Sequence, residues 1–570
     1  MQPMSPASGR SGYQDGGDDP DSSFRLAAAL SAALWLLSGA IYILLRSNQF
    51  TDVDGAMRCL QIYWRRPPYL GSNNHMLHPI NVWLWSQLTA ALGIAASEPI
   101  GFMHTIAAMN AVFASGSVAL VNFLVWRFTR RWKLSVVCAL AYGLSSALIA
   151  HATNSAEPVV GLFVSLIAIV VVVEGLSRRR LALLFAGGVC LAFALANYES
   201  MLLVAPLLYL VCLIWPTEKV SPDQLHSESV ELTDFSAALW LRAVRVIACG
   251  LGTLIGAVVI YGTAYYFVGI RAPNEMFQTF LSVPGSNVYG GVHWATIVNV
   301  PLGLVANMVA VLPANYGGLK SLFRPRSHAL SIVGIAGASA VVLAALSLLA
   351  SGISRVCRTR TAKFVGLALA AAFSIDLFPV IYWGPLYDKL WLQPIAVGLV
   401  LAGVVTHWTD TALARRISVL AIVLIAIEAL VNVPRALSAR VQPTVCLGDA
   451  QKVAGLVGPK DKVVTDFDKV STLWMGLYEA DPSRTLVFPA TSPGESLATL
   501  DRWTKECSVA GCRIFFVSLL NQPREIWDAF LGKRLKVPFD SVDRYRRGSR
   551  IVQQFVCEDS GLRVFEPSSK

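Results

Sequence analysis

Two aspartates separated by one residue stand just after the first long apolar stretch of the chain. Asp52 and Asp54 lie in the segment FTDVDGAMRC. Carboxylates placed this way outside a membrane can take a proton from an acceptor hydroxyl, or hold a divalent cation such as Mg²⁺ or Mn²⁺ against a phosphate. Pairs of this spacing also occur by chance in solvated turns. The neighbouring residues therefore have to decide between a chemical and a structural role.

Basic and histidine side chains crowd the same segment. Arg58, Arg65 and Arg66 follow the aspartates, and basic residues outside run against the tendency of Lys and Arg to stay on the cytoplasmic side. An arginine can grip a phosphate through two hydrogen bonds, whereas anchoring at the membrane interface is the alternative role. His75 and His78 are candidates for lining a substrate cavity or binding metal, although histidines beside a helix start are more often structural.

Further polar residues stand at the ends of later apolar stretches. His151, Asn154 and Glu157 follow the third stretch, and Glu199 separates the fifth from the sixth. Ionisable groups at membrane depth cost up to about 3 kcal/mol, so they tend to face protein or water. We predict that these four residues line the same cavity, with capping of helix ends at the water interface as the alternative.

Composition shows which elements must position these residues. Of 570 residues, 55% are hydrophobic and only 15% are charged, and the mean hydropathy is +0.55. A soluble protein needs roughly a quarter of its residues charged to cover its surface, so a soluble enzyme, a disordered scaffold and a fibrous repeat are excluded. Basic cytoplasmic loops explain the net charge of +11, and we expect no nucleic-acid partner.

Eleven apolar stretches are long enough to cross about 30 Å of hydrocarbon. They lie near residues 24–45, 100–126, 134–151, 158–175, 181–197, 200–216, 244–268, 329–352, 364–383, 390–408 and 417–433. The short basic clusters between them fall on one side if the chain starts inside the cell. We therefore predict a disordered cytoplasmic tail over 1–23, a transmembrane domain over 24–433 and a first outer loop over 47–99.

Two further apolar segments, if they were counted as spans, would place basic clusters on the outer side of the membrane. Residues 78–93 contain Trp83 and Trp85, which suit a helix on the membrane surface. Residues 296–316 contain several asparagines and prolines, and we predict a re-entrant or interfacial helix there. The GLGTLIG segment at 250–256 lies within a span and is interpreted as a helix-packing feature.

The C-terminal region, 434–570, has the composition of a soluble α/β domain outside the membrane. Runs rich in β-forming residues occur at 462–467, 485–488, 513–519 and 551–556, with a helical pattern over 495–505. The four cysteines of this region show no zinc-binding spacing, so disulfides are expected in an oxidising compartment. Cys507 and Cys512 are one candidate pair.

Three of these features together resemble the GT-C superfamily of polyprenyl-phosphate-sugar glycosyltransferases, in the branch of the protein O-mannosyltransferases and aminoarabinose transferases. They are the acidic loop after the first span, the HPINVWLW segment, which is similar to a His-Pro-Pro-Leu-Tyr surface helix, and YDKLWLQPIAVGLVL at 387–401. The last is similar to a Glu-Arg-Tyr-Leu-Leu-Pro motif, with Asp388 and Lys389 in the acidic and basic places. It departs from that motif because the arginine is a lysine, the tyrosine is Leu390, and the proline is delayed to Pro394.

The resemblance implies a polytopic α-helical membrane protein of about 11 transmembrane helices with a C-terminal extracytoplasmic α/β domain. It implies an outer-loop aspartate as catalytic base, with Asp54 preferred to Asp52, and phosphate contact at Lys389. Tyr387 and Asp388 join the predicted cavity residues.

The expected activity is an inverting transfer of sugar from a polyprenyl-phosphate donor to a hydroxyl on a lipid, glycan or protein, at the outer face of a bacterial inner membrane. A transporter or flippase for lipid-linked sugars is the alternative from another class, because scattered polar groups inside many spans would also serve a substrate path. A glycan ligase or polymerase that uses diphosphate-linked donors is a third reading.

Overall fold

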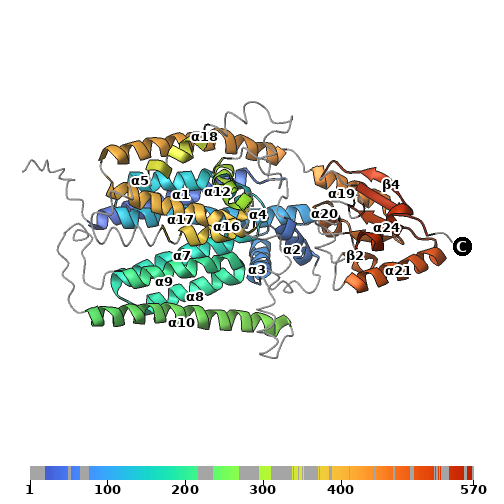
Figure 1. Ribbon diagram of the computed structural model, residues 1–570, viewed down its shortest axis with the longest axis horizontal. Coiled ribbons are helices and arrows are strands. Elements are labelled where there is room, and N and C mark those ends of the chain that lie inside the picture. Colours follow the sequence, from blue (N-terminus) through green and yellow to red (C-terminus); the bar gives the residue numbers. More distant parts are fainter. Residues whose placement is uncertain are drawn as a thin grey trace, which may run out of the picture.

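The computed structural model shows a bundle of membrane helices with a small α/β domain at one end, which we call the domain end (Figure 1). It describes residues 20–48, 53–64, 76–94, 96–215, 235–268, 294–309, 373–383, 388–409, 411–441, 445–465, 469–479, 481–487, 493–518, 538–557 and 561–567, together with short pieces between 337 and 371 and between 520 and 527.

Five helices in the described part of the chain are long and apolar enough to cross a membrane. The helices that contain these spans are α1 (Pro20–Leu44), α4 (Pro99–Thr129), α7 (Pro158–Arg178), α10 (Phe235–Val268) and α18 (Thr411–Val441). The protein is therefore an integral membrane protein. Helix α1 starts inside the tail predicted over 1–23, whose first 19 residues lie outside the described part. Helix α18 continues past the predicted domain boundary at 433.

Shorter helices account for most of the remaining predicted stretches. They are α5 (Trp132–Leu144), α6 (Ser146–Ala152), α8 (Leu181–Asn197), η1 (Glu199–Leu203), α9 (Val204–Ile214), α16 (Phe378–Trp383) and α17 (Leu392–Trp408). The stretches at 329–352 and 364–383 are described only in part. The stretch predicted as one span over 134–151 forms two helices, α5 and α6, which are bent by 62° and together make a broken span or a re-entrant loop. The predicted class, a polytopic helical membrane protein with a C-terminal α/β region, is confirmed.

Glycines bring α8 and α10 into backbone contact. A Cβ added to Gly188 would lie 2.1 Å from the Cys249 carbonyl oxygen, and one added to Gly252 would lie 2.1 Å from the Phe185 carbonyl oxygen. Only glycine permits two helix backbones to approach so closely. The interpretation of GLGTLIG as a helix-packing feature is therefore confirmed.

The loop predicted over 47–99 contains two helices, α2 (Val53–Tyr63) and α3 (Leu77–Ala91). Helix α3 confirms the helix expected over 78–93, and it leaves Trp83 and Leu84 more than half exposed while Val82 is fully buried. Helix α2 was not predicted, because its eleven residues lack the long apolar repeat that a span provides. The described part of 296–316 belongs to α12 (Trp294–Met308), which has Pro301 inside it.

The α/β domain contains a five-stranded sheet in the order β2-β1-β3-β5-β4. Its strands are β1 (Lys462–Thr465), β2 (Thr485–Val487), β3 (Ile514–Val517), β4 (Ser549–Gln554) and β5 (Gly561–Phe565). The first three are parallel, and β5 runs antiparallel to both β3 and β4. The β-rich runs predicted from the sequence match β1 to β4, and the predicted helix matches α21 (Pro493–Ala510). Helices α19 (Val445–Leu456), α20 (Lys469–Leu477) and α24 (Phe539–Arg547) complete the described elements.

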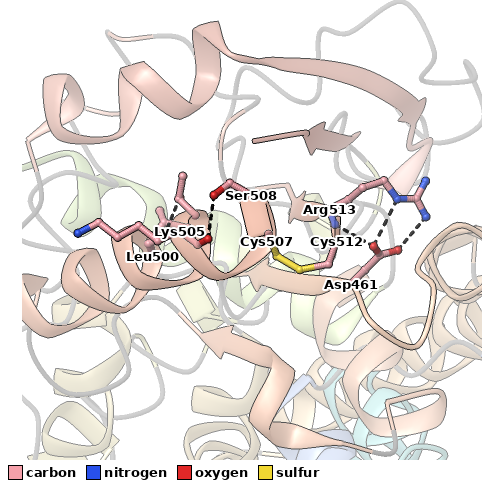
Figure 2. The surroundings of a disulfide bond; sticks show 8 residues. Asp461, Leu500, Lys505, Cys507, Ser508, Cys512 and Arg513 are labelled. Atoms are coloured by element: carbon pink, nitrogen blue, oxygen red, sulfur yellow. Dashed lines mark hydrogen bonds and ion pairs between the residues drawn. A yellow bond between two sulfur atoms is a disulfide. The ribbon is translucent and has the colours of Figure 1, made fainter. Parts of the chain in front are cut away.

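Two disulfides and an ion pair tie this domain together. The predicted Cys507–Cys512 bond closes the turn between α21 and β3 (Figure 2), and Cys446–Cys557 joins two segments 111 residues apart. Beside the first bond, Asp461 accepts hydrogen bonds from the Arg513 side chain at 2.7 Å and from the Arg513 backbone at 3.0 Å (Figure 2). Burial alone would raise the pKa of Asp461, but these bonds and one from a glycine backbone outweigh it and lower that pKa.

Candidate active site

The predicted aspartate loop enters the structure at the amino end of α2, where Asp54 is the second helical residue. The next residue, Gly55, lies against the turn that follows α6. A Cβ on Gly55 would lie 2.0 Å from the Ser155 carbonyl oxygen and 3.2 Å from the Ala156 Cα. Because both are backbone atoms, only glycine fits. This contact fixes the backbone of Asp54 beside residues 153–157.

Hydrogen bonds from other helices hold the turn at 153–157. Asn110, buried on α4, donates from its side-chain amide to the carbonyls of Asn154 at 2.7 Å and Ala156 at 2.8 Å. The Ser47 amide, just after α1, donates to the Thr153 carbonyl at 2.9 Å. The end of α1, which leads into the aspartate loop, is thus fastened to the same turn.

The break between α5 and α6 directs this turn toward α2. A break in a membrane helix frees backbone carbonyls that need hydrogen-bond donors. The Tyr42 hydroxyl of α1 donates to the Gly143 carbonyl at 2.6 Å, and the Asn432 amide of α18 donates to the Leu144 carbonyl at 2.6 Å. Ser145 donates to the preceding turn and accepts from an α6 amide. Two other helices, α1 and α18, and Ser145 at the bend itself therefore stabilise it.

The three residues predicted after the third stretch are all buried here. His151 and Asn154 are 4% exposed, and Glu157 is fully buried at the start of α7. The Asn154 side chain donates to the Ala150 carbonyl at 2.8 Å, while its own oxygen accepts no hydrogen bond from the described residues. Burial of this kind places the three side chains in the protein interior at the domain end rather than at a solvated helix end, which was the alternative.

The segment around Glu199 packs on the first turn of α7. A Cβ on Gly161 would lie 3.2 Å from the Tyr198 Cβ and 3.3 Å from the Asn197 Cβ, so these residues sit close to the α7 helix that Glu157 begins. Asn197 also accepts a hydrogen bond from the Asn81 side chain, which brings α3 to the same place. Glu199 itself is the first residue of η1, and its side chain lies outside the described part.

Lys389, from the C-terminal half of the chain, lies beside Tyr198. It lies in η4 (Asp388–Leu390), is only 8% exposed, and places its Nζ 5.9 Å from the centre of the Tyr198 ring. Element η4 packs against α6, which carries His151. One turn beyond Lys389, Gln393 donates to a carboxylate oxygen of the buried Asp376 at 2.8 Å. Charged side chains are rarely buried at membrane depth and often mark functional sites, so the buried Lys389 ammonium and Asp376 carboxylate favour a site for a charged ligand.

The structure therefore brings together part of the predicted set. Lys389 lies beside Tyr198, and the Tyr198 segment packs on the first turn of α7, the helix that Glu157 begins. The element that carries Lys389 contacts α6, and the turn after α6, between His151 and Glu157, contacts the amino end of α2. His78 is fully buried on α3, the helix whose Asn81 is bonded to Asn197. The backbones of Asp54 and Arg58 in α2 and of Asp388 in η4 are placed, but their side chains are not described. The remaining predictions lie outside the described residues, namely Asp52, Arg65, Arg66, His75 and Tyr387.

No three His, Cys, Asp or Glu side chains among the described residues lie close enough to hold a metal ion. Asp52 lies outside that part of the chain, so a metal at the aspartate pair stays a prediction. The reaction proposed below routes no step through one.

Sequence reasoning missed the residues that hold the site together. Gly55 is needed for a close backbone contact and Gly161 lies in a tight one, and nothing in their local sequence distinguishes them from other glycines. Asn110 carried a usable signal, because an asparagine within a long apolar stretch indicates a polar partner inside the membrane.

Fold and site together define a polytopic helical membrane protein whose buried polar cluster lies at the domain end. The chain is similar in structure to ArnT from Cupriavidus metallidurans bound to undecaprenyl phosphate, with 12% identity, a TM-score of 0.53, and coverage of 96% of this chain and 98% of that one. The apo state of the same ArnT gives 11% identity, a TM-score of 0.54, and coverage of 95% and 99%. No protein-family model matches the sequence, and no curated protein is significantly similar to it. At this identity the likeness shows a shared fold.

Proposed function

We propose that the protein is a glycosyltransferase that moves a sugar from a polyprenyl-phosphate donor to a hydroxyl acceptor. Its location is the bacterial inner membrane, with the domain end and the α/β domain on the extracytoplasmic side. One observation carries the proposal: the buried Lys389 lies beside Tyr198 in an element that contacts α6, and the turn after α6, with the buried His151 and Glu157 at its two ends, contacts the helix that bears Asp54. The likeness in fold to ArnT, a protein whose structure holds undecaprenyl phosphate, supports a lipid-linked donor.

The chemistry is one displacement with inversion. The acceptor oxygen attacks the anomeric carbon, the bond from that carbon to the phosphate oxygen breaks, and the electron pair leaves with the polyprenyl phosphate. Asp54 takes the acceptor proton as general base. A phosphate leaving group already stabilises negative charge, so the main demand on the protein is electrostatic.

Lys389 meets that demand in the proposed site. Its ammonium lies in a buried setting, where the attraction between opposite charges is much stronger than in water. Arg58, Arg65 and Arg66 are proposed as further phosphate ligands. The lipid tail lies among membrane lipids, and the acceptor hydroxyl belongs to a lipid, glycan or protein.

The test is transfer from a radiolabelled polyprenyl-phosphate sugar, with a panel of sugars, by purified protein in nanodiscs with membrane extract as acceptor. Asp54→Asn is expected to lower turnover about 10²- to 10⁴-fold, the range that a general base contributes. Lys389→Met keeps the apolar stem and removes the charge, so we expect a loss in both donor affinity and turnover. Asp52→Asn is the matched control, expected to keep activity if Asp54 is the base.

Two results would contradict the proposal. Full transfer by both the Asp52→Asn and Asp54→Asn variants would remove the base from this loop. If no donor is consumed, while labelled lipid or solute crosses the membrane of vesicles that contain the protein, the chain is a transporter or flippase instead.

A further inference from the structure

Helix α2 is held between the membrane bundle and the α/β domain (Figure 1). Its amino end contacts the 153–157 turn through Gly55, as described above. Its other side contacts α20 of the α/β domain. Five residues separate Gly55 from Leu60, which turns the helix by about 140°. The two contacts therefore lie on different sides of α2.

The contact with α20 is as close as the one with the bundle. A Cβ on Gly476 would lie 2.2 Å from the Leu60 Cδ1, 3.1 Å from its Cγ and 3.0 Å from its Cβ. The leucine tip could rotate away, but its Cβ is fixed by the helix backbone. Next to it, the Trp64 indole donates a hydrogen bond to the Gly476 carbonyl. The fit thus depends on a glycine at position 476.

A continuous apolar core surrounds this contact. Leu60 and Cys59 of α2 and Met103 of α4 belong to one buried cluster with Trp474 of α20 and Phe515 of β3, and all five are at most 1% exposed. This apolar cluster extends without interruption from the α/β domain into the membrane bundle. Domains that only recognise a ligand and move freely usually meet across smaller and more polar interfaces.

We propose that the α/β domain positions the catalytic helix. It does so through Gly476, Leu60 and Trp64, which set the place of α2 and hence of Asp54 at its amino end. These are positioning residues that act through α2. The inference deepens the proposed function and rests on it for the role of Asp54. That the α/β domain holds α2 in place does not depend on that function.

The test compares Gly476→Ala with Gly455→Ala in full-length protein in nanodiscs. Both glycines are the second-last residue of a helix, α20 and α19 respectively, and a Cβ on Gly455 meets nothing within 4 Å. Both substitutions gain the same helix propensity, about 1 kcal/mol. A difference between the variants therefore reports the contact with Leu60.

Two readouts are measured. Hydrogen exchange of the α2 peptide should be faster in Gly476→Ala than in Gly455→Ala. Transfer should show turnover lowered about tenfold in Gly476→Ala with KM for the donor little changed, because misplacing a catalytic group by a fraction of an ångström costs rate. Adding Leu60→Ala to Gly476→Ala should restore part of that turnover, because it removes the Cγ and Cδ atoms that the new methyl meets.

The outcomes separate the inference from the proposed function. Equal exchange and equal turnover in the two glycine variants overturn the inference. A loss of turnover in Gly476→Ala that comes with a lower melting temperature of the α/β domain, and that Leu60→Ala does not rescue, also overturns it. If the wild type transfers no sugar, the proposed function fails, and hydrogen exchange still decides whether the domain holds α2.

Discussion

Adding one methyl group at Gly55 should abolish most of the proposed transfer activity without removing any side chain of the site. The added Cβ would lie 2.0 Å from the Ser155 carbonyl oxygen, while ordinary contact begins at 3.4 Å. Because the obstacle is backbone, held in place by Asn110, α2 must move by about 1.4 Å to make room. That movement takes Asp54 with it.

The expected cost follows from the displacement. A misplacement of about 1 Å can lower the rate of a positioned reaction roughly 100-fold, which equals about 2.7 kcal/mol of transition-state stabilisation. Alanine also favours the helix by about 1 kcal/mol over glycine, so the propensity of α2 itself is not weakened. We therefore expect Gly55→Ala to lower turnover roughly 100-fold in protein that remains folded.

The assay is the transfer of labelled sugar in nanodiscs, with Gly262→Ala as the control. Gly262 lies in α10, where a Cβ meets nothing within 4 Å, so its variant should behave as wild type. The variant that combines Gly55→Ala with Asp54→Asn completes a double-mutant cycle. If both changes act through Asp54, the second should add little to the first.

Two results would refute this reasoning. One is a Gly55→Ala variant that retains activity close to that of Gly262→Ala. The other is full additivity of Gly55→Ala and Asp54→Asn, which would show that the glycine acts on something other than the carboxylate.

Three further predictions concern the parts that support the site. Asn110→Ala removes both side-chain donors to buried carbonyls of the 153–157 turn and should cost roughly 2–4 kcal/mol of stability, measured by thermal unfolding, together with most of the transfer activity. Asp461→Asn should destabilise the α/β domain by about 2 kcal/mol at pH 7 and make its stability less sensitive to acid. In the wild type, the contribution of the lowered Asp461 pKa is present above about pH 4 and is lost as the pH falls through the folded-state pKa, which pH-dependent unfolding would detect. Replacing Cys446 and Cys557 by serine should cost more than removing Cys507–Cys512, about 4–5 against about 2 kcal/mol from loop entropy, and equal melting temperatures for the two double variants would contradict this.

The sequence alone determined most of the elements of the fold. Apolar stretches of sufficient length, such as 100–126 and 158–175, predicted α4 and α7 because a membrane span needs about 20 apolar residues whatever surrounds it. The short β-rich runs predicted four of the five strands, and Cys507 and Cys512, one candidate pair among the four C-terminal cysteines, are bonded in the structure. Each of these signals is local, because it lies within one short stretch of the sequence.

Tertiary structure decided how the site is assembled. The bend between α5 and α6 has no breaking residue such as proline at Ser145, and it is stable because Tyr42 and Asn432 from distant helices satisfy the freed carbonyls. Helix α2 is too short to be stable alone and is held by contacts at Gly55 and Leu60. Such contacts join residues far apart in the chain, and no local pattern encodes them. The sequence thus determined which groups could do the chemistry, while packing between distant helices decided which of them meet.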